Sequence, residues 1–228
     1  DLTDRALLVA DPASRSFYLP PLAAKFLRDK RPEAVAQTGD RLADRAYALA
    51  LENGYQKFER FPVLEAEWPA LSAALPRLLQ GENPRLQTLC SALRTFLNFS
   101  GRWDDSLRLS QQAEEKALAA NDFSNAGWRA YHAGWMHQLR GQAPEVLACA
   151  ARAETHWQTA KAGAHEQATA IRLRGLAHEL EKNYPAAIAA YQQALDLHRT
   201  RAPESADVAI GLSGLADAER LSGDYPAA

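Results

Sequence analysis

An internal repeat of about 40 residues is the feature that most constrains the fold of this chain. The segment KNYPAA at 182–187 returns as GDYPAA at 223–228, and related turn-like segments begin at Gly101 and Gly141. The four segments therefore start at nearly equal intervals. A repeat of this length, without strand-like alternation between the turns, is typical of a solenoid of helical hairpins, because one hairpin cannot bury its own apolar face.

The residues on both sides of the turns favour a helical hairpin in each repeat. Gly134 and Gly175 each precede a turn by seven positions, where one helix must approach its partner closely. After the third turn, Tyr191, Ala194 and Leu195 continue at helical spacing.

The third repeat, around the turn at Lys182, resembles the tetratricopeptide repeat. The resemblance implies an all-α, right-handed superhelical solenoid, of the extended kind whose period exceeds the minimal 34 residues. The first repeat departs from the pattern, with Arg94 at the small position and Ser110 and Glu114 where apolar residues are usual. The positions that carry the resemblance are Gly175, Tyr184, Ala187, Tyr191, Ala194 and Leu195.

The repeat array is predicted to span residues 84–228, with the last repeat truncated. Helix-start residues mark several boundaries, because a capping side chain or a missing N–H costs little there; they are Asp122, Pro144, Pro185, Pro203 and Pro226. The predicted helices are 84–100, 103–120, 124–140, 143–161, 164–182, 184–199 and 204–222.

The N-terminal residues predict a small β-hairpin followed by a helix. Two short strands, at 5–10 and 16–19, flank a turn-forming segment. A helix over 21–30 is expected to present Leu22 and Phe26 on an apolar stripe.

Residues 1–31 resemble the wing and last helix of the winged-helix domain in STAND-type signalling ATPases, the NB-ARC-like group. The segment 65–71, within a helical linker over 32–83, is similar to the linker between winged helix and repeats in the same ATPases. The resemblance implies a regulatory winged helix rather than a DNA reader, and an upstream nucleotide-binding domain. The chain is therefore expected to be a piece of a longer polypeptide.

The linker itself is predicted to hold two helices. The first runs over 32–53 and the second over about 62–79. Pro69 is expected to start or kink the second helix and Pro76 to bend it, because an interior proline removes one backbone hydrogen bond.

Composition gives no sign of a nucleic-acid or membrane partner. The net charge is −2, from 26 basic and 28 acidic residues, so no global field favours an anionic partner. No apolar run approaches a membrane span of about 18 residues. Cys90 and Cys149 lie outside any Cys-x-x-Cys pattern, which favours buried thiols in a reducing cytoplasm.

The sequence contains no recognisable catalytic or cofactor motif. A P-loop and a Gly-x-Ser-x-Gly elbow are both missing. His132 and His137 are five residues apart with no glutamate between them, so the spacing of a zinc protease is not met. The chain is therefore predicted to be no enzyme and to hold no metal or cofactor.

One aromatic stripe stands out as a candidate binding surface. Trp128, Tyr131, His132 and Trp135 are spaced i, i+3, i+4 and i+7, which places them on one face of a helix. Large aromatic anchors beside a few charges are typical of a recognition surface. The alternative is that the two tryptophans simply pack against adjacent helices.

Aligning the repeats by their turns adds further residues to this predicted concave wall. The additional partner-binding candidates are Gln138, Arg172, Glu179, Asp217 and Arg220.

Two functions remain open at this stage. The first is a non-catalytic regulatory module of a STAND-type ATPase, which binds a protein, a peptide or a small-molecule signal in the concave groove. The second is a freestanding tetratricopeptide scaffold or cargo adaptor.

Overall fold

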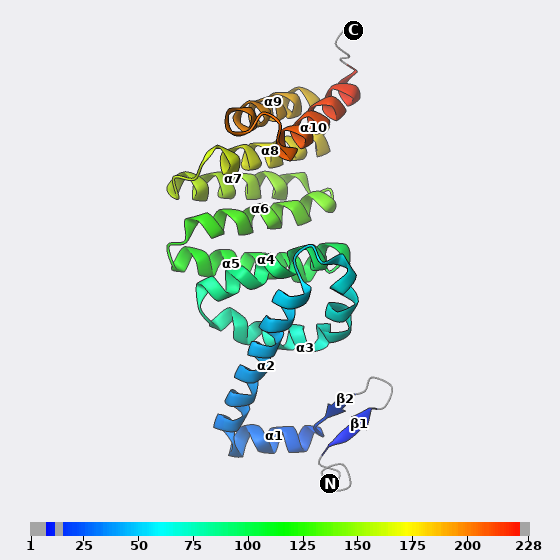
Figure 1. Cartoon of the computed structure of the whole chain (residues 1–228), viewed down its shortest axis with the longest axis vertical. Coiled ribbons are helices and arrows are strands. Elements are labelled where there is room, and N and C mark those ends of the chain that lie inside the picture. The colour runs from blue at the N-terminus through cyan, green and yellow to red at the C-terminus, as the bar shows by residue number, and fades with distance from the viewer. Residues whose placement is uncertain (1–7, 12–15, 224–228) are drawn as a thin grey trace.

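The computed structural model describes residues 8–11 and 16–223. It is an elongated stack of helices with a small hairpin at one end (Figure 1). The predicted strand residues 5–7, and Pro226 in the truncated last repeat, lie outside the described residues.

The repeat region consists of helices that alternate in direction along the stack. Each boundary lies within two residues of its predicted position. The seven helices are α4 (Asn83–Phe99), α5 (Trp103–Ala119), α6 (Phe123–Leu139), α7 (Ala143–Thr159), α8 (Ala164–Leu180), α9 (Tyr184–Arg201) and α10 (Ala206–Ser222).

Left-handed residues reverse the chain at each turn from α4 to α9, and one more ends α10. The four predicted turn positions all have positive φ, at Gly101 (69°), Gly141 (69°), Lys182 (59°) and Gly223 (79°). Asn121 (57°) and Lys161 (52°) have the same conformation between repeats, although lysine adopts it less readily than asparagine.

A pair of backbone hydrogen bonds closes each of the turns from α4 to α9. At the first turn, Gly101 N donates to Asn98 O (3.2 Å) and Arg102 N donates to Leu97 O (2.9 Å). This is the Schellman pattern, which satisfies carbonyls that the helix end leaves unpaired.

Capping side chains mark where several of the helices begin. Asp122 accepts a hydrogen bond from Asn125 N at 3.2 Å, as its predicted role at a helix start requires. The prediction for Pro203 was wrong, because α10 begins only at Ala206. Ser205 is its N-cap, and Ser205 Oγ accepts from Val208 N at 3.4 Å.

The N-terminal hairpin pairs β1 (Val9–Asp11) with β2 (Ser16–Tyr18) in antiparallel register. It leads into α1 (Pro21–Lys30). The predicted apolar stripe of this helix is not covered, since Leu22 and Phe26 are 80% and 60% exposed.

The linker forms α2 (Pro32–Asn53), a short 3-10 turn (Phe58–Arg60) and α3 (Phe61–Gln80). Helix α3 runs through Pro69 and Pro76, so neither proline starts or ends it. Buried residues of α2 and α3 share one core cluster with those of α4 and α5.

Small residues mediate the packing between repeat helices. A Cβ added at Gly134 would lie 2.9 Å from Cys149 Cβ of α7 and 2.7 Å from Leu173 of α8. A Cβ at Gly175 would lie 2.7 Å from the ring of Tyr191. The close approach that the sequence predicts at Gly175 is therefore to the ring of Tyr191 on α9.

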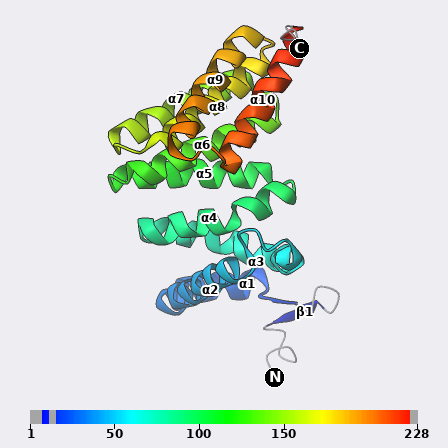
Figure 2. The same cartoon turned by 45° about the horizontal axis from the view of Figure 1, so that its top comes forward.

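The last helix, α10, packs against α9 at the end of the stack opposite the hairpin (Figure 2). The turns at 101, 141 and 182 join the helices in pairs, in which α4, α6 and α8 are the first helices, and α10 continues this series.

Replacing Gly175 by leucine should destabilise the chain by roughly 1–3 kcal/mol, because the added side chain would enter the space of the buried Tyr191 ring. Chemical denaturation monitored by circular dichroism measures the change.

Gly39→Leu is the matched control. Gly39 is also helical, and a Cβ there meets nothing within 4 Å, so helix propensity alone should leave stability unchanged or raise it slightly. Equal midpoints for Gly175→Leu and the parent would show that the tight contact is absent.

Candidate functional site

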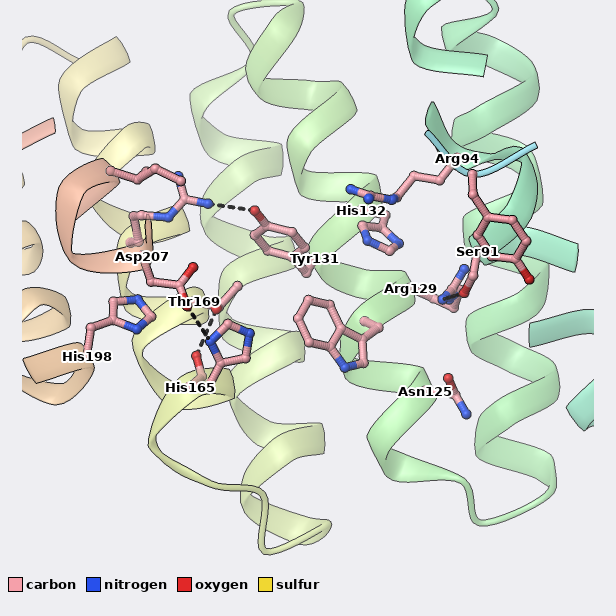
Figure 3. A pocket seen from close by; sticks show the side chains of 14 residues that line it. Ser91, Arg94, Asn125, Arg129, Tyr131, His132, His165, Thr169, His198 and Asp207 are labelled. Atoms are coloured by element: carbon pink, nitrogen blue, oxygen red, sulfur yellow. Dashed lines mark hydrogen bonds and ion pairs between the residues drawn. The ribbon is translucent and has the colours of Figure 1, made fainter. Parts of the chain in front are cut away.

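A groove opens along the first helices of the repeats. Its cavity volume is about 540 Å³, and α4, α6, α8 and α10 supply most of its lining (Figure 3). We call this cavity the groove; its lining residues are Tyr55, Ser91, Arg94, Asn125, Trp128, Arg129, Tyr131, His132, His165, Thr169, Arg172, His198, Asp207 and Ile210.

The aromatic floor of the groove is held in place by a buried tryptophan behind it. Trp157 of α7 is fully buried and its ring meets Trp128 edge-on, with ring centroids 5.1 Å apart. Its indole Nε1 donates to Ser124 O at 3.2 Å. A Cβ at Gly127 would lie 2.3 Å from that indole, so only glycine at 127 lets Trp157 sit there.

Tyr131 joins two walls of the groove. Its side chain is buried, and its hydroxyl oxygen accepts a hydrogen bond from Arg172 Nη2 at 2.7 Å. The Arg172 guanidinium carbon also lies 5.9 Å from the Trp135 ring centroid, within the range of a cation–π contact. Helices α6 and α8 are thus tied together through side chains that face the groove.

Trp135 lies in a second, smaller cavity next to the groove. This cavity has a volume of about 290 Å³, and Arg94, Tyr131 and His132 line both cavities. Phe58 and Phe99, both exposed, form its other apolar wall. The two cavities together make a continuous surface of flat side chains and arginines.

Arg129 is the least expected residue of the groove, because its charged side chain is buried. Ser91, the Cys90 thiol and the charge of Asp122 interact with it there. The residue is 2% exposed, and Nη2 donates to Ser91 Oγ at 3.2 Å. Within residues 8–11 and 16–223, its Nε has no hydrogen-bond partner. Burial lowers the pKa of Arg129 from its ordinary value. A buried guanidinium of this kind is stabilised by an anion placed beside it.

The groove is rich in cationic groups and poor in acids. Its arginines, Arg94, Arg129 and Arg172, form no ion pair with any carboxylate of the described residues. Asp207 is the one acidic side chain among the lining residues. The arrangement can therefore receive an anionic group beside an aromatic surface.

His132 lies among these cations. Burial, followed by the charges of Arg129 and Arg94, lowers the pKa of His132 well below its ordinary value of 6.5. The imidazole is therefore neutral near pH 7 and can donate or accept a hydrogen bond without adding charge.

The structure brings five of the predicted binding residues together. Trp128, Tyr131, His132 and Arg172 line the groove, and Trp135 lines the adjoining cavity. Tyr131 and half-buried Trp128 also pack on Trp157 of α7, so these two residues of the stripe contact a neighbouring helix as well as the groove.

The other four predicted residues lie outside both cavities. Glu179 accepts a hydrogen bond from Tyr191 Oη at 2.8 Å. Asp217 and Arg220, both exposed, face each other at 3.5 Å. Gln138 has a buried Oε1 that finds no hydrogen-bond partner in the described part of the chain. These residues occupy the later turns of their helices, whereas the groove opens over the earlier turns.

Sequence reasoning missed several residues of the groove, among them Arg94, Arg129, His165, His198 and Asp207. Arg129 adjoins the small residues that pack the helices and gave no signal of its own. His165 and Asp207 could have been linked by the repeat, because each is the second residue of a first helix.

Comparison with known proteins supports a repeat array. Residues 166–228 match the tetratricopeptide repeat family, which supports a tetratricopeptide repeat array, and the helices before them pack as in other helical repeats. Repeats of this family generally mediate protein–protein interaction and are typically non-catalytic. A comparison with curated proteins gives no match.

A solved structure shares the overall fold. The crystal structure of BtubC (BKLC) from P. vanneervenii is similar with a TM-score of 0.56 and 15% sequence identity, over 86% of this chain and 85% of that chain. At this identity the likeness concerns the fold alone. In the described part of this chain, no helix combines the length and apolarity that a bilayer crossing requires.

The lowered pKa of His132 predicts an acid-sensitive contribution to stability. The folded-state pKa lies below the unfolded value of about 6.5, so the unfolded chain binds the proton first and this contribution is lost as pH falls below about 6.5. His132→Gln should therefore lose less stability than the parent between about pH 7.5 and pH 5.5.

Urea denaturation at the two pH values measures the difference between parent and variant. Because all other groups titrate in both proteins, an equal loss in the two would contradict the shift at His132.

Proposed function

We propose that this chain is a non-catalytic binding module whose groove binds a protein or peptide segment that carries an acidic group. The observation that carries the proposal is a set of three arginines, Arg94, Arg129 and Arg172, which lie beside an aromatic surface and form no ion pair within the described residues. An acidic side chain or a C-terminal carboxylate would meet these guanidinium groups, which can bind a carboxylate through two parallel hydrogen bonds.

The aromatic residues supply the apolar part of the same surface. Trp135 is half-buried and lines the smaller cavity with exposed Phe58 and Phe99. Aromatic side chains in a concave site carry a large share of binding energy in many interfaces. An apolar residue near the acidic group of the partner would fit there.

The parent protein in this proposal is a STAND-type signalling ATPase, in which the repeats respond to a ligand and act on an upstream nucleotide-binding domain. The resemblance of residues 1–31 to a winged-helix tail and of 65–71 to a linker supports it. A freestanding scaffold or cargo adaptor, with no cofactor, is the second candidate. The complete coding sequence distinguishes them, since only the first requires a P-loop domain upstream.

Loss of one groove arginine should selectively weaken the binding of an acidic ligand. Peptides are first selected from a random phage-displayed library against the chain and are expected to be enriched in acidic groups. Arg94→Gln should then weaken a selected peptide about tenfold or more, because hydrogen bonds to charged groups contribute about 1.5–3 kcal/mol. Arg94 is exposed, so its loss should spare the fold.

Fluorescence polarisation measures the peptide affinity of each variant. Arg108→Gln is the matched control. Arg108 is also exposed and unpaired in the described residues, but it lies on α5 away from the groove. Equal losses in the two variants, or selected peptides without acidic groups, would contradict the proposal.

Trp135→Ala should separate binding from stability. We expect the variant to bind the selected peptide more weakly by roughly 2 kcal/mol or more, as for other aromatic anchors, with a smaller change in stability. Trp157→Ala is the contrast: this residue is fully buried, and its truncation should cost roughly 3–5 kcal/mol of stability.

Thermal melting and peptide affinity are measured on both variants. If Trp135→Ala melts as low as Trp157→Ala, or binds the peptide as tightly as the parent, Trp135 is not an anchor.

A further inference from the structure

Three side chains that can ligate a metal ion come together where α8, α9 and α10 meet. They are His165, His198 and Asp207, and one ligand atom from each lies within 4.8 Å of the other two. His165 Nδ1 is 3.2 Å from Asp207 Oδ2, and the two imidazole centroids are 5.7 Å apart. Figure 3 shows the three side chains gathered at one side of the groove.

The fold explains why these three residues meet. His165 is in the first turn of α8, and His198 is in the last turns of α9, which runs antiparallel to α8. A short turn then starts α10, which carries Asp207 in its own first turn. Residues that are 33 and 9 positions apart are thus placed at a single junction.

The close pair at this junction is not aligned for a hydrogen bond. Although His165 Nδ1 lies only 3.2 Å from the Asp207 carboxylate, it is a buried nitrogen with no hydrogen-bond partner among the residues that the structure describes. Two ligand atoms that share a metal ion are held at this separation without pointing at each other. In a tetrahedral zinc site, with bonds of about 2.0–2.2 Å, they are about 3.4 Å apart.

We propose that His165, His198 and Asp207 bind a divalent transition-metal ion, with Zn²⁺ as the best fit. Two imidazoles and one carboxylate are a ligand set that zinc accepts, and Mg²⁺ or Ca²⁺ would require more oxygen ligands. The remaining distances, up to 4.8 Å, close by small side-chain rotations. No metal site is expected from the sequence, because the three ligands do not have the spacing of a known metal-binding motif.

The proposed metal site lies in the wall of the groove. All three ligands line the groove, so a fourth coordination position faces the cavity and is open to water or to a ligand donor atom. The ring of Trp128 lies 5.9 Å from that of His165 and forms an apolar wall beside the site. Asp207, the groove's one acidic lining residue, neutralises part of the charge of the ion.

Metal binding is tested on the whole chain without any partner, so its outcome is independent of the proposed peptide-binding function. The chain is treated with EDTA, exchanged into chelator-free buffer and titrated with ZnCl₂ by isothermal titration calorimetry. We expect one saturable site per chain. His198→Ala and Asp207→Asn should each weaken Zn²⁺ binding at least about tenfold, since even the loss of a group that only supports a ligand costs 10–100-fold.

His178→Ala is the matched control. His178 lies on the same helix as His165 and pairs with Glu181 in the last turn, so its loss should leave the Zn²⁺ affinity unchanged. Melting of each variant without metal tests the fold, and the isosteric Asp207→Asn keeps the test valid if His198→Ala melts early.

Three results would overturn the assignment. The first is a parent chain with no saturable Zn²⁺ binding, and the second is an unchanged affinity in both ligand variants. The third is an equal loss in His178→Ala, which would show binding to surface histidines. A plain ion pair between His165 and Asp207, with no metal site, predicts the first result.

Discussion

The rest of this structure depends on the tight turn that reverses the chain after each repeat helix. From α4 to α9, every turn holds one residue with a left-handed backbone, and paired backbone hydrogen bonds close it. Because each turn sends the next helix back, alternate helices face the same side of the stack. The groove exists for this reason: α4, α6, α8 and α10 present their side chains to one space. Its chemistry is then set by what those four helices carry.

On helix α6, small residues pack against the neighbouring helices and large residues form the surface of the groove. Ala130, Ala133 and Gly134 are buried and let α6 approach its neighbours closely. The large side chains of the same helix are therefore left for the groove, where Trp157 behind them fixes their position. The arginines complete the surface. No carboxylate in the described part of the chain forms an ion pair with them, so an acidic ligand is their natural complement.

Sequence reasoning captured the periodic part of this architecture and missed what depends on position within it. Turn residues such as Gly101 and Gly141 recur at the repeat spacing, so the helix boundaries could be predicted to within two residues. The face of each helix could also be predicted, but not the turns of the helix over which the groove opens; Glu179 and Asp217 are on the expected helices and lie outside it. Contacts between unlike residues of different repeats leave no period, which is why Arg129 and His198 gave no signal.

A crystal structure of the chain with a selected acidic peptide tests the central claim most directly. The account predicts that the peptide lies in the groove, with a carboxylate oxygen within hydrogen-bonding distance of Arg129 or Arg94 and an apolar side chain against Trp135. A peptide bound to the opposite side of the stack, on α5, α7 or α9, with the groove empty, would contradict it.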